Sequence, residues 1–244
     1  MKETNWFKTW FDSKYYHLLY KNRSQKEADD FIDKLVLDLC LNKDKKVLDL
    51  GCGKGRHSIK LGQYFKEVIG IDLSPNSINS ALKTEEKNIQ FQIGDMRNFN
   101  TTKGLGYIFN LFTSFGYFDN INDNLKVLKR CHLHLEQDGQ LIIDYLNPSN
   151  IIKKTFINEH KQINRVDFNI TKKIDNNKVI KNISINDSGN IYHFQERVQL
   201  FNLNDFKTML NKTGFQIQSI FGNYQLNKFV SSSDRLIILA KKIY

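Results

Sequence analysis

The amino-acid sequence predicts a doubly wound α/β fold, in which a mostly parallel sheet has helices on both faces. Short apolar runs alternate with helical patterns over residues 46–146, which is the order of repeated βα units. These runs are continuously apolar rather than alternating, as is typical of strands covered on both faces. A glycine-rich turn directly follows the first run at Gly51-Cys52-Gly53 and leads into a helical pattern.

Each element follows from its own pattern. Over residues 1–41 we expect a helical cap, because aromatic side chains crowd its start and Ala28, Phe31 and Leu35 recur at helical spacing. Seven strands are expected at 46–50, 68–71, 89–93, 107–112, 140–146, 215–221 and 236–240. Further helices are expected at 56–65, 77–83, 122–135 and 203–213, the last ending before Gly214.

The middle of the chain has a different character. From Val166 to Phe201 apolar residues alternate with polar ones, and Asp175-Asn176-Asn177 and Asp187-Ser188-Gly189-Asn190 are turn signals. This pattern predicts a small antiparallel β insertion after the fifth strand. We therefore divide the chain into the cap (1–41), the α/β core (42–150), the insertion (151–202) and the rest of the core (203–244).

Composition bounds the class of protein. The 244 residues are 40% hydrophobic and 25% charged, which is typical of a globular chain. The net charge of +10 is compatible with a nucleic-acid partner, but the lysines are scattered, so a solvated surface is favoured. No apolar run suits a membrane span or a secretory signal.

Three widely spaced cysteines favour a reducing, cytoplasmic location. The Cys131-His132-Leu133-His134 segment falls in a helical pattern, where successive side chains point in different directions, so we expect no metal site there.

The segment Val47–Ser58 carries the strongest functional signal. A buried strand, a glycine turn and a helix N-terminus together let the backbone approach a ligand closely. Arg56 stands where a dinucleotide fingerprint would have its last glycine, and Asp49 suits a cationic ligand better than a pyrophosphate.

This segment resembles motif I of class I S-adenosylmethionine (SAM)-dependent methyltransferases, roughly (V/I)LDxGxGxG. The later strand ends resemble that family in order, at Gly70–Ser74, Gly94–Met96 and Asn110–Tyr117. The resemblance covers residues 46–146 and implies a Rossmann-like fold, an enzyme, and S-adenosyl-L-methionine as cofactor with S-adenosyl-L-homocysteine as product. One departure is Leu105-Gly106, where the family usually has Phe-Asp, which questions the packing of that strand.

The resemblance also implies roles for individual residues. Asp72 would accept both ribose hydroxyls, Asp95 would reach the adenine amino group, and Asp49 would contact the amino group of SAM. The complete expected cofactor site consists of Tyr16, Tyr20, Asp49, Gly51, Cys52, Gly53, Arg56, Asp72, Leu73, Gly94, Asp95, Met96, Asn110, Leu111 and Phe112.

The segment Tyr15–Tyr20 resembles the flank of a bacterial subgroup of methyltransferase-domain proteins, and we expect it to be a lid over the cofactor. Glu196 and Arg197, in the insertion, could face the site, but a solvated pair on a strand is the favoured interpretation.

The predicted function is methyl transfer to a small-molecule acceptor. A base is needed only if the acceptor must lose a proton, and the candidates are His17, His57 and Tyr117. An RNA or protein methyltransferase is the first alternative: the basic charge favours it, but no Asn-Pro-Pro-Tyr tetrad follows the fourth strand. A non-catalytic SAM-binding protein is the third-ranked interpretation. The insertion would shape the acceptor site or an oligomer contact.

Overall fold

The computed structural model describes residues 6–22, 24–153 and 157–243. A seven-stranded sheet runs through the larger part of the molecule in the order β10-β11-β5-β4-β1-β2-β3. The strands are β1 (Lys46–Leu50), β2 (Glu67–Asp72), β3 (Ile89–Ile93), β4 (Leu105–Asn110), β5 (Leu135–Leu146), β10 (Phe215–Phe221) and β11 (Arg235–Lys242). The pairs are parallel except for the two that β11 makes, with β5 on one side and with β10 on the other, which are antiparallel. The predicted fold class is confirmed.

Helices cover both faces of this sheet. They are α3 (Gln25–Asp38), α4 (Arg56–Gly62), α5 (Pro75–Ala81), α6 (Ile121–His134), α7 (Pro148–Ile152) and α8 (Leu203–Lys212). Successive strand residues point to opposite faces, so Val47 packs in a cluster with α3 and α4 residues while Leu48 packs with residues of α6 and α8. The central strands β1 and β4 are therefore buried on both sides, whereas the edge strands β3 and β10 are partly exposed.

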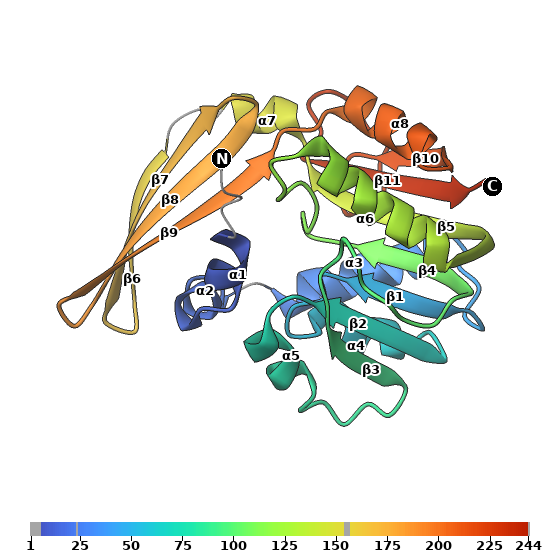
Figure 1. Cartoon of the computed structure of the whole chain (residues 1–244), viewed down its shortest axis with the longest axis horizontal. Coiled ribbons are helices and arrows are strands. Elements are labelled where there is room, and N and C mark those ends of the chain that lie inside the picture. Colours follow the sequence, from blue (N-terminus) through green and yellow to red (C-terminus); the bar gives the residue numbers. More distant parts are fainter. Residues whose placement is uncertain (1–5, 23, 154–156, 244) are drawn as a thin grey trace.

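A second, four-stranded sheet forms the insertion. Its strands are β6 (Ile157–Ile163), β7 (Val166–Asp175), β8 (Lys178–Asp187) and β9 (Asn190–Gln199), paired antiparallel in that order. The turns have residues with positive φ, including Asn176 (46°), Asn177 (57°) and Gly189 (88°), as tight hairpins require. Figure 1 shows this sheet reaching away from the α/β core. The predicted antiparallel insertion is confirmed.

Two short helices, α1 (Trp6–Phe11) and α2 (Lys14–Leu19), lie between the insertion and the α/β core (Figure 1). Ser13 caps α2 and Ser24 caps α3, so the expected N-terminal cap is three helices. Trp10 is fully buried, with its ring 4.9 Å from that of Phe194 on β9. The N-terminal helices are thus packed on the insertion.

Glycine stands at position 106, where the family usually has aspartate, for a steric reason. A Cβ atom there would lie 2.5 Å from the Cβ of Lys45, so only glycine fits this close approach. The strand is central in the sheet, between β1 and β5. Glycine therefore serves the packing of β4 rather than weakening it.

Across the parts of the chain that the structure describes, no helix combines the length and apolar character needed to cross a bilayer. The four-part division stays a prediction, and its residues 1–5, 23, 154–156 and 244 lie outside the described residues.

Candidate active site

The glycine turn after β1 brings backbone to the edge of the sheet. Gly51, Gly53 and Gly55 have φ values of +82°, +57° and +83°, a left-handed region that favours glycine. A Cβ at Gly51 would lie 2.8 Å from that of Ser114. Among the described residues, no heavy atom lies within 4 Å of the position a Gly53 Cβ would take. The turn therefore needs glycine, and at Gly53 its backbone faces open space.

Asp72 ends β2 beside this turn. One carboxylate oxygen accepts a 2.8 Å hydrogen bond from the Gly53 amide and the other accepts one of 2.8 Å from the Ser74 amide. Burial raises the pKa of the carboxyl, and these backbone bonds oppose the rise. Because each oxygen has two acceptor positions, Asp72 retains capacity for further donors.

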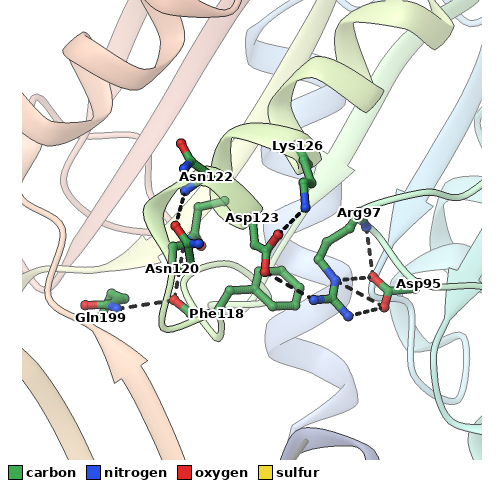
Figure 2. Close-up of polar contacts among 9 residues, drawn as sticks. Asp95, Arg97, Phe118, Asn120, Asn122, Asp123, Lys126 and Gln199 are labelled. Atoms are coloured by element: carbon green, nitrogen blue, oxygen red, sulfur yellow. Dashed lines mark hydrogen bonds and ion pairs between the residues drawn. The ribbon is translucent and has the colours of Figure 1, made fainter. Parts of the chain in front are cut away.

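Asp95 follows β3 and is held by Arg97. Figure 2 shows the Arg97 guanidinium between Asp95 and Asp123, with Nη2 2.7 Å from Asp95 Oδ2 and Nη1 3.3 Å from Asp123 Oδ2. The guanidinium also lies 4.6 Å from the Phe118 ring centroid. Burial acts to raise the pKa of Asp95, but the Arg97 bonds outweigh it and the pKa is lowered. Asp95 is thus fixed as a carboxylate.

The loop after β4 is strained. Phe112 and Thr113 have φ values of 57° and 61°, which non-glycine residues rarely adopt. Asp144 on β5 holds both: its Oδ2 accepts from the Phe112 amide at 2.9 Å and its carbonyl accepts from the Thr113 amide at 2.9 Å. Arg235 on β11 bonds Asp144 Oδ1 at 2.7 Å and Thr113 Oγ1 at 2.9 Å. A buried carboxylate and a partly buried guanidinium therefore fix the loop conformation.

These strand ends open into a cavity of ≈ 740 Å³. Of the residues expected at the cofactor site, the following line it: Tyr16, Tyr20, Gly51, Cys52, Gly53, Arg56, Asp72, Leu73, Gly94, Asp95, Met96, Leu111 and Phe112. The three base candidates, His17, His57 and Tyr117, line it as well. The structure thus brings segments from the whole length of the resemblance to one place.

Asp49 and Asn110 are not among the residues that line the cavity, and their expected contacts with the cofactor stay predictions. Asp49 is 1% exposed, and its carboxylate accepts a 2.6 Å bond from the Ser58 hydroxyl beneath the glycine turn. Asn110 is 2% exposed, and its amide donates to the Leu50 carbonyl at 2.9 Å. Both side chains are used inside the protein, where they support the neighbouring turn and strand.

The far wall of the cavity comes from the N-terminal helices and the insertion. Glu196, expected to be solvated, instead faces the cavity with its side chain 16% exposed. Its Oε1 accepts 2.7 Å bonds from Trp10 Nε1 and Tyr20 OH, and its Oε2 lies 2.9 Å from Lys181 Nζ. Burial acts to raise the Glu196 pKa, but Lys181, Tyr20 and Trp10 together outweigh it and the pKa is lowered. The sequence interpretation of Glu196 was wrong because pairing across strands brings it to Lys181.

A family model described as a methyltransferase domain matches residues 41–214. The chain belongs to this methyltransferase domain family. The protein is 26% identical over 217 residues to YqeM of Bacillus subtilis (strain 168), whose name assigns it only provisionally to the methyltransferases; the match covers 84% of this chain and 87% of YqeM.

Solved structures share its fold. The S-adenosylmethionine-dependent methyltransferase from Clostridium acetobutylicum ATCC 824 superposes with a TM-score of 0.81 at 20% identity, covering 94% of this chain and 96% of that one. SAM-bound CalS10, an amino pentose methyltransferase from Micromonospora echinaspora, superposes with a TM-score of 0.68 at 18% identity, covering 94% and 97%. The family match makes the protein a methyltransferase, and the fold it shares with these structures agrees with the SAM-dependent class that the motif resemblance implies.

The residues present fit SAM as the cofactor. At Gly53 the cavity wall leaves room for a ligand. The carboxylates that follow β2 and β3 and the apolar side chains of Leu73 and Met96 line the same cavity. When bound, SAM supplies a methyl group made electrophilic by the adjoining sulfonium.

Proposed function

We propose that this methyltransferase acts on a small-molecule acceptor held between the strand ends of the α/β core and the four-stranded sheet. The observation that carries the proposal is that one cavity is lined by both parts, with the glycine turn on one side and Lys172, Lys181 and Glu196 on the other. Its volume of ≈ 740 Å³ falls within the usual range for small-molecule sites, roughly 300–1,000 Å³. Because the cofactor takes part of this volume, what remains suits a small acceptor.

In this proposal the strand ends hold the cofactor. Asp72 accepts the ribose hydroxyls with the acceptor positions that Gly53 and Ser74 leave. Asp95, kept ionised by Arg97, accepts the adenine amino group, and Met96 packs beside the ring. Arg56, whose guanidinium lies 5.0 Å from the Phe112 ring centroid, borders the methionine end.

The N-terminal helices close the acceptor side. The Phe11 ring lies 5.1 Å from that of Tyr16 and 5.0 Å from that of Tyr117, and all three residues line the cavity. Such a cover aligns the acceptor and excludes water. Tyr117 OH donates to the Thr113 carbonyl at 2.6 Å, so among the base candidates its proton is already committed. His17 and His57 remain the proposed proton acceptors where the acceptor must lose one.

The fold of CalS10, an amino pentose methyltransferase, supports a small polar acceptor, because its likeness covers 94% of this chain. The free thiols of Cys40, Cys52 and Cys131 favour a reducing compartment, and we place the enzyme in the cytoplasm.

The test is a screen of the full chain with SAM and a library of small metabolites, read by mass spectrometry as S-adenosylhomocysteine release. We expect turnover with one or a few related small molecules, and loss of that turnover in Asp72→Ala. Methyl transfer to RNA or protein, with none to any small molecule, would overturn the proposal.

A further inference from the structure

A row of charged side chains crosses the four-stranded sheet at the cavity. Lys172 on β7 is the register partner of Lys181 on β8, and Lys181 is the register partner of Glu196 on β9. All three line the cavity, so they share the face of the sheet that is turned to the α/β core. We call these three residues the charged row.

Much of this face on β7 and β8 is apolar, although Asp187 of β8 and Glu159 and Lys161 of β6 also lie on it. Residues at even spacing from the row include these buried hydrophobics: Val166, Phe168, Ile170, Val179, Ile183 and Ile185. Placing charges within such a face costs free energy unless they are paired or bind something. Two lysines directly opposite each other on neighbouring strands add a like-charge repulsion. The repulsion between Lys172 and Lys181 is a cost that a bound anion would offset, which points to a role in binding.

The contacts in the row show which groups it presents. Glu196 accepts from Trp10, Tyr20 and Lys181, which uses both of its oxygens. Lys181 Nζ bonds Tyr20 OH at 2.5 Å as well as Glu196, and an ammonium has three N–H donors. The carboxylate thus orients Lys181, while the two lysines bring N–H donors and positive charge to the cavity.

The charge of the whole cavity agrees. Among the described residues that line it, six are Lys or Arg and three are Asp or Glu. Two of those acids, Asp72 and Asp95, stand at the strand ends proposed for the cofactor, and only Glu196 lies on the acceptor side. A ligand on that side meets an excess of cations.

We infer that the charged row binds an oxyanion of the acceptor, a carboxylate or a phosphate, with Lys172 and Lys181 as its donors. The inference rests on the proposed function and names the class of acceptor: an anionic small molecule. Bidentate geometry is not required, because lysine binds oxyanions as a point charge with freely rotating donors.

The experiment uses the full chain saturated with S-adenosylhomocysteine and two probes, inorganic phosphate and acetate, at constant ionic strength. Acetamide is the neutral counterpart of acetate. Binding is followed by tryptophan fluorescence, because Trp10 is one of two tryptophans in the chain and its indole donates to Glu196. Saturable binding of phosphate alone would identify a phosphate-bearing acceptor, and of acetate alone a carboxylate; either supports the inference.

The matched variants are Lys172→Met and Lys173→Met. Lys173 is the next residue, exposed on the other face of β7, and its removal changes the net charge equally. We expect Lys172→Met to weaken anion binding roughly ten-fold or more, as for the loss of a charged hydrogen bond. Lys173→Met should change it less than about two-fold. Lys172→Arg, which keeps the charge, should retain binding and guards against a folding effect.

Three results would overturn the inference: wild-type protein that binds neither anion saturably, equal weakening by the Lys172→Met and Lys173→Met variants, or acetamide bound as well as acetate. Loss of S-adenosylhomocysteine affinity in Lys172→Met would also overturn it, since the row would then serve the cofactor. By contrast, wild-type protein that does not bind S-adenosylhomocysteine would refute the proposed function, and the inference with it.

Discussion

The Asp12 carboxylate accepts a 2.6 Å hydrogen bond from the Ser74 hydroxyl, and this contact joins the N-terminal helices to the turn that follows Asp72. The same carboxylate accepts from the Asn76 amide at 2.9 Å. Because the Ser74 amide donates to Asp72, two carboxylates hold opposite sides of one turn. A movement of α1 and α2 away from the core would therefore release a turn that contacts the proposed ribose site.

We predict that residues 6–20 exchange amide hydrogens faster in the free protein than in the complex with S-adenosylhomocysteine. These helices are short and line the cavity. Side-chain contacts and the hydrogen bonds of Asp12 hold them over it, so we expect them to open locally when no ligand is bound. Asp12→Ala should raise exchange of this segment further in both states. Hydrogen exchange with mass spectrometry measures it.

The control is Asp30→Ala, which removes an exposed acid paired with Lys26 at the surface of α3. It should leave exchange of residues 6–20 unchanged. Equal protection in the free and bound states would show a fixed part of the core, and the lid hypothesis would be wrong.

Local patterns were sufficient to predict the fold. The strands β1 and β2 lie where apolar runs predicted them, because burial on both faces favours apolar residues at successive positions. Strand β3 also lies where predicted, but it is an edge strand whose sequence IQFQI alternates. The carboxyl ends of these strands are marked by glycine and aspartate, so most of the cofactor wall followed from the motif. Strand β5 begins at Leu135, earlier than the predicted residue 140. The sequence did not predict this start because Glu136-Gln137-Asp138-Gly139, which belongs to the strand, is polar.

Contacts between distant segments were not predictable. Asp144 and Arg235 are 91 residues apart, and their ion pair exists only because β11 is inserted next to β5. Glu196 is 186 residues from Trp10, and neither residue carries a local signal of the other. For Asp49 the motif indicated importance, but its burial and its bond from Ser58 under the glycine turn could not be predicted from the motif alone.

Asp72→Ala should weaken SAM binding by ~1.5–3 kcal/mol, roughly ten- to a hundred-fold in affinity. The substitution removes the proposed partner of the ribose hydroxyls and also the acceptor for the Gly53 and Ser74 amides. Asp44→Ala, a change at an exposed ion pair, is the control. Isothermal titration calorimetry gives both affinities, and an unchanged value for Asp72→Ala would exclude the ribose assignment.

Asp144→Ala should destabilise the fold by about 3–5 kcal/mol, because it leaves the Arg235 guanidinium partly buried without its carboxylate and the Phe112 amide without its acceptor. Asp138→Ala breaks a surface pair with Lys241 and should cost less than about 1 kcal/mol. Urea unfolding of the variants gives the comparison. Similar costs for both would mean that the strained loop does not depend on this buried pair.

Asp49 predicts a pH dependence of stability with a definite sign. Burial raises the pKa of its carboxyl to about 7, against the opposing bond from Ser58, whereas in the unfolded chain it is ~3.9. A group whose pKa is higher in the folded state contributes stability below the unfolded value, and that contribution is lost as pH rises through the folded value. Asp49→Asn is neutral throughout, so the free energy of unfolding of the wild type minus that of the variant should fall between about pH 4 and pH 7. The slope should approach ~1.4 kcal/mol per pH unit, the effect of one proton.

Taking the difference cancels the other titrating groups that the two proteins share. Urea unfolding of both proteins across this range measures it, and a difference that stays constant with pH would show that Asp49 is ionised in the fold.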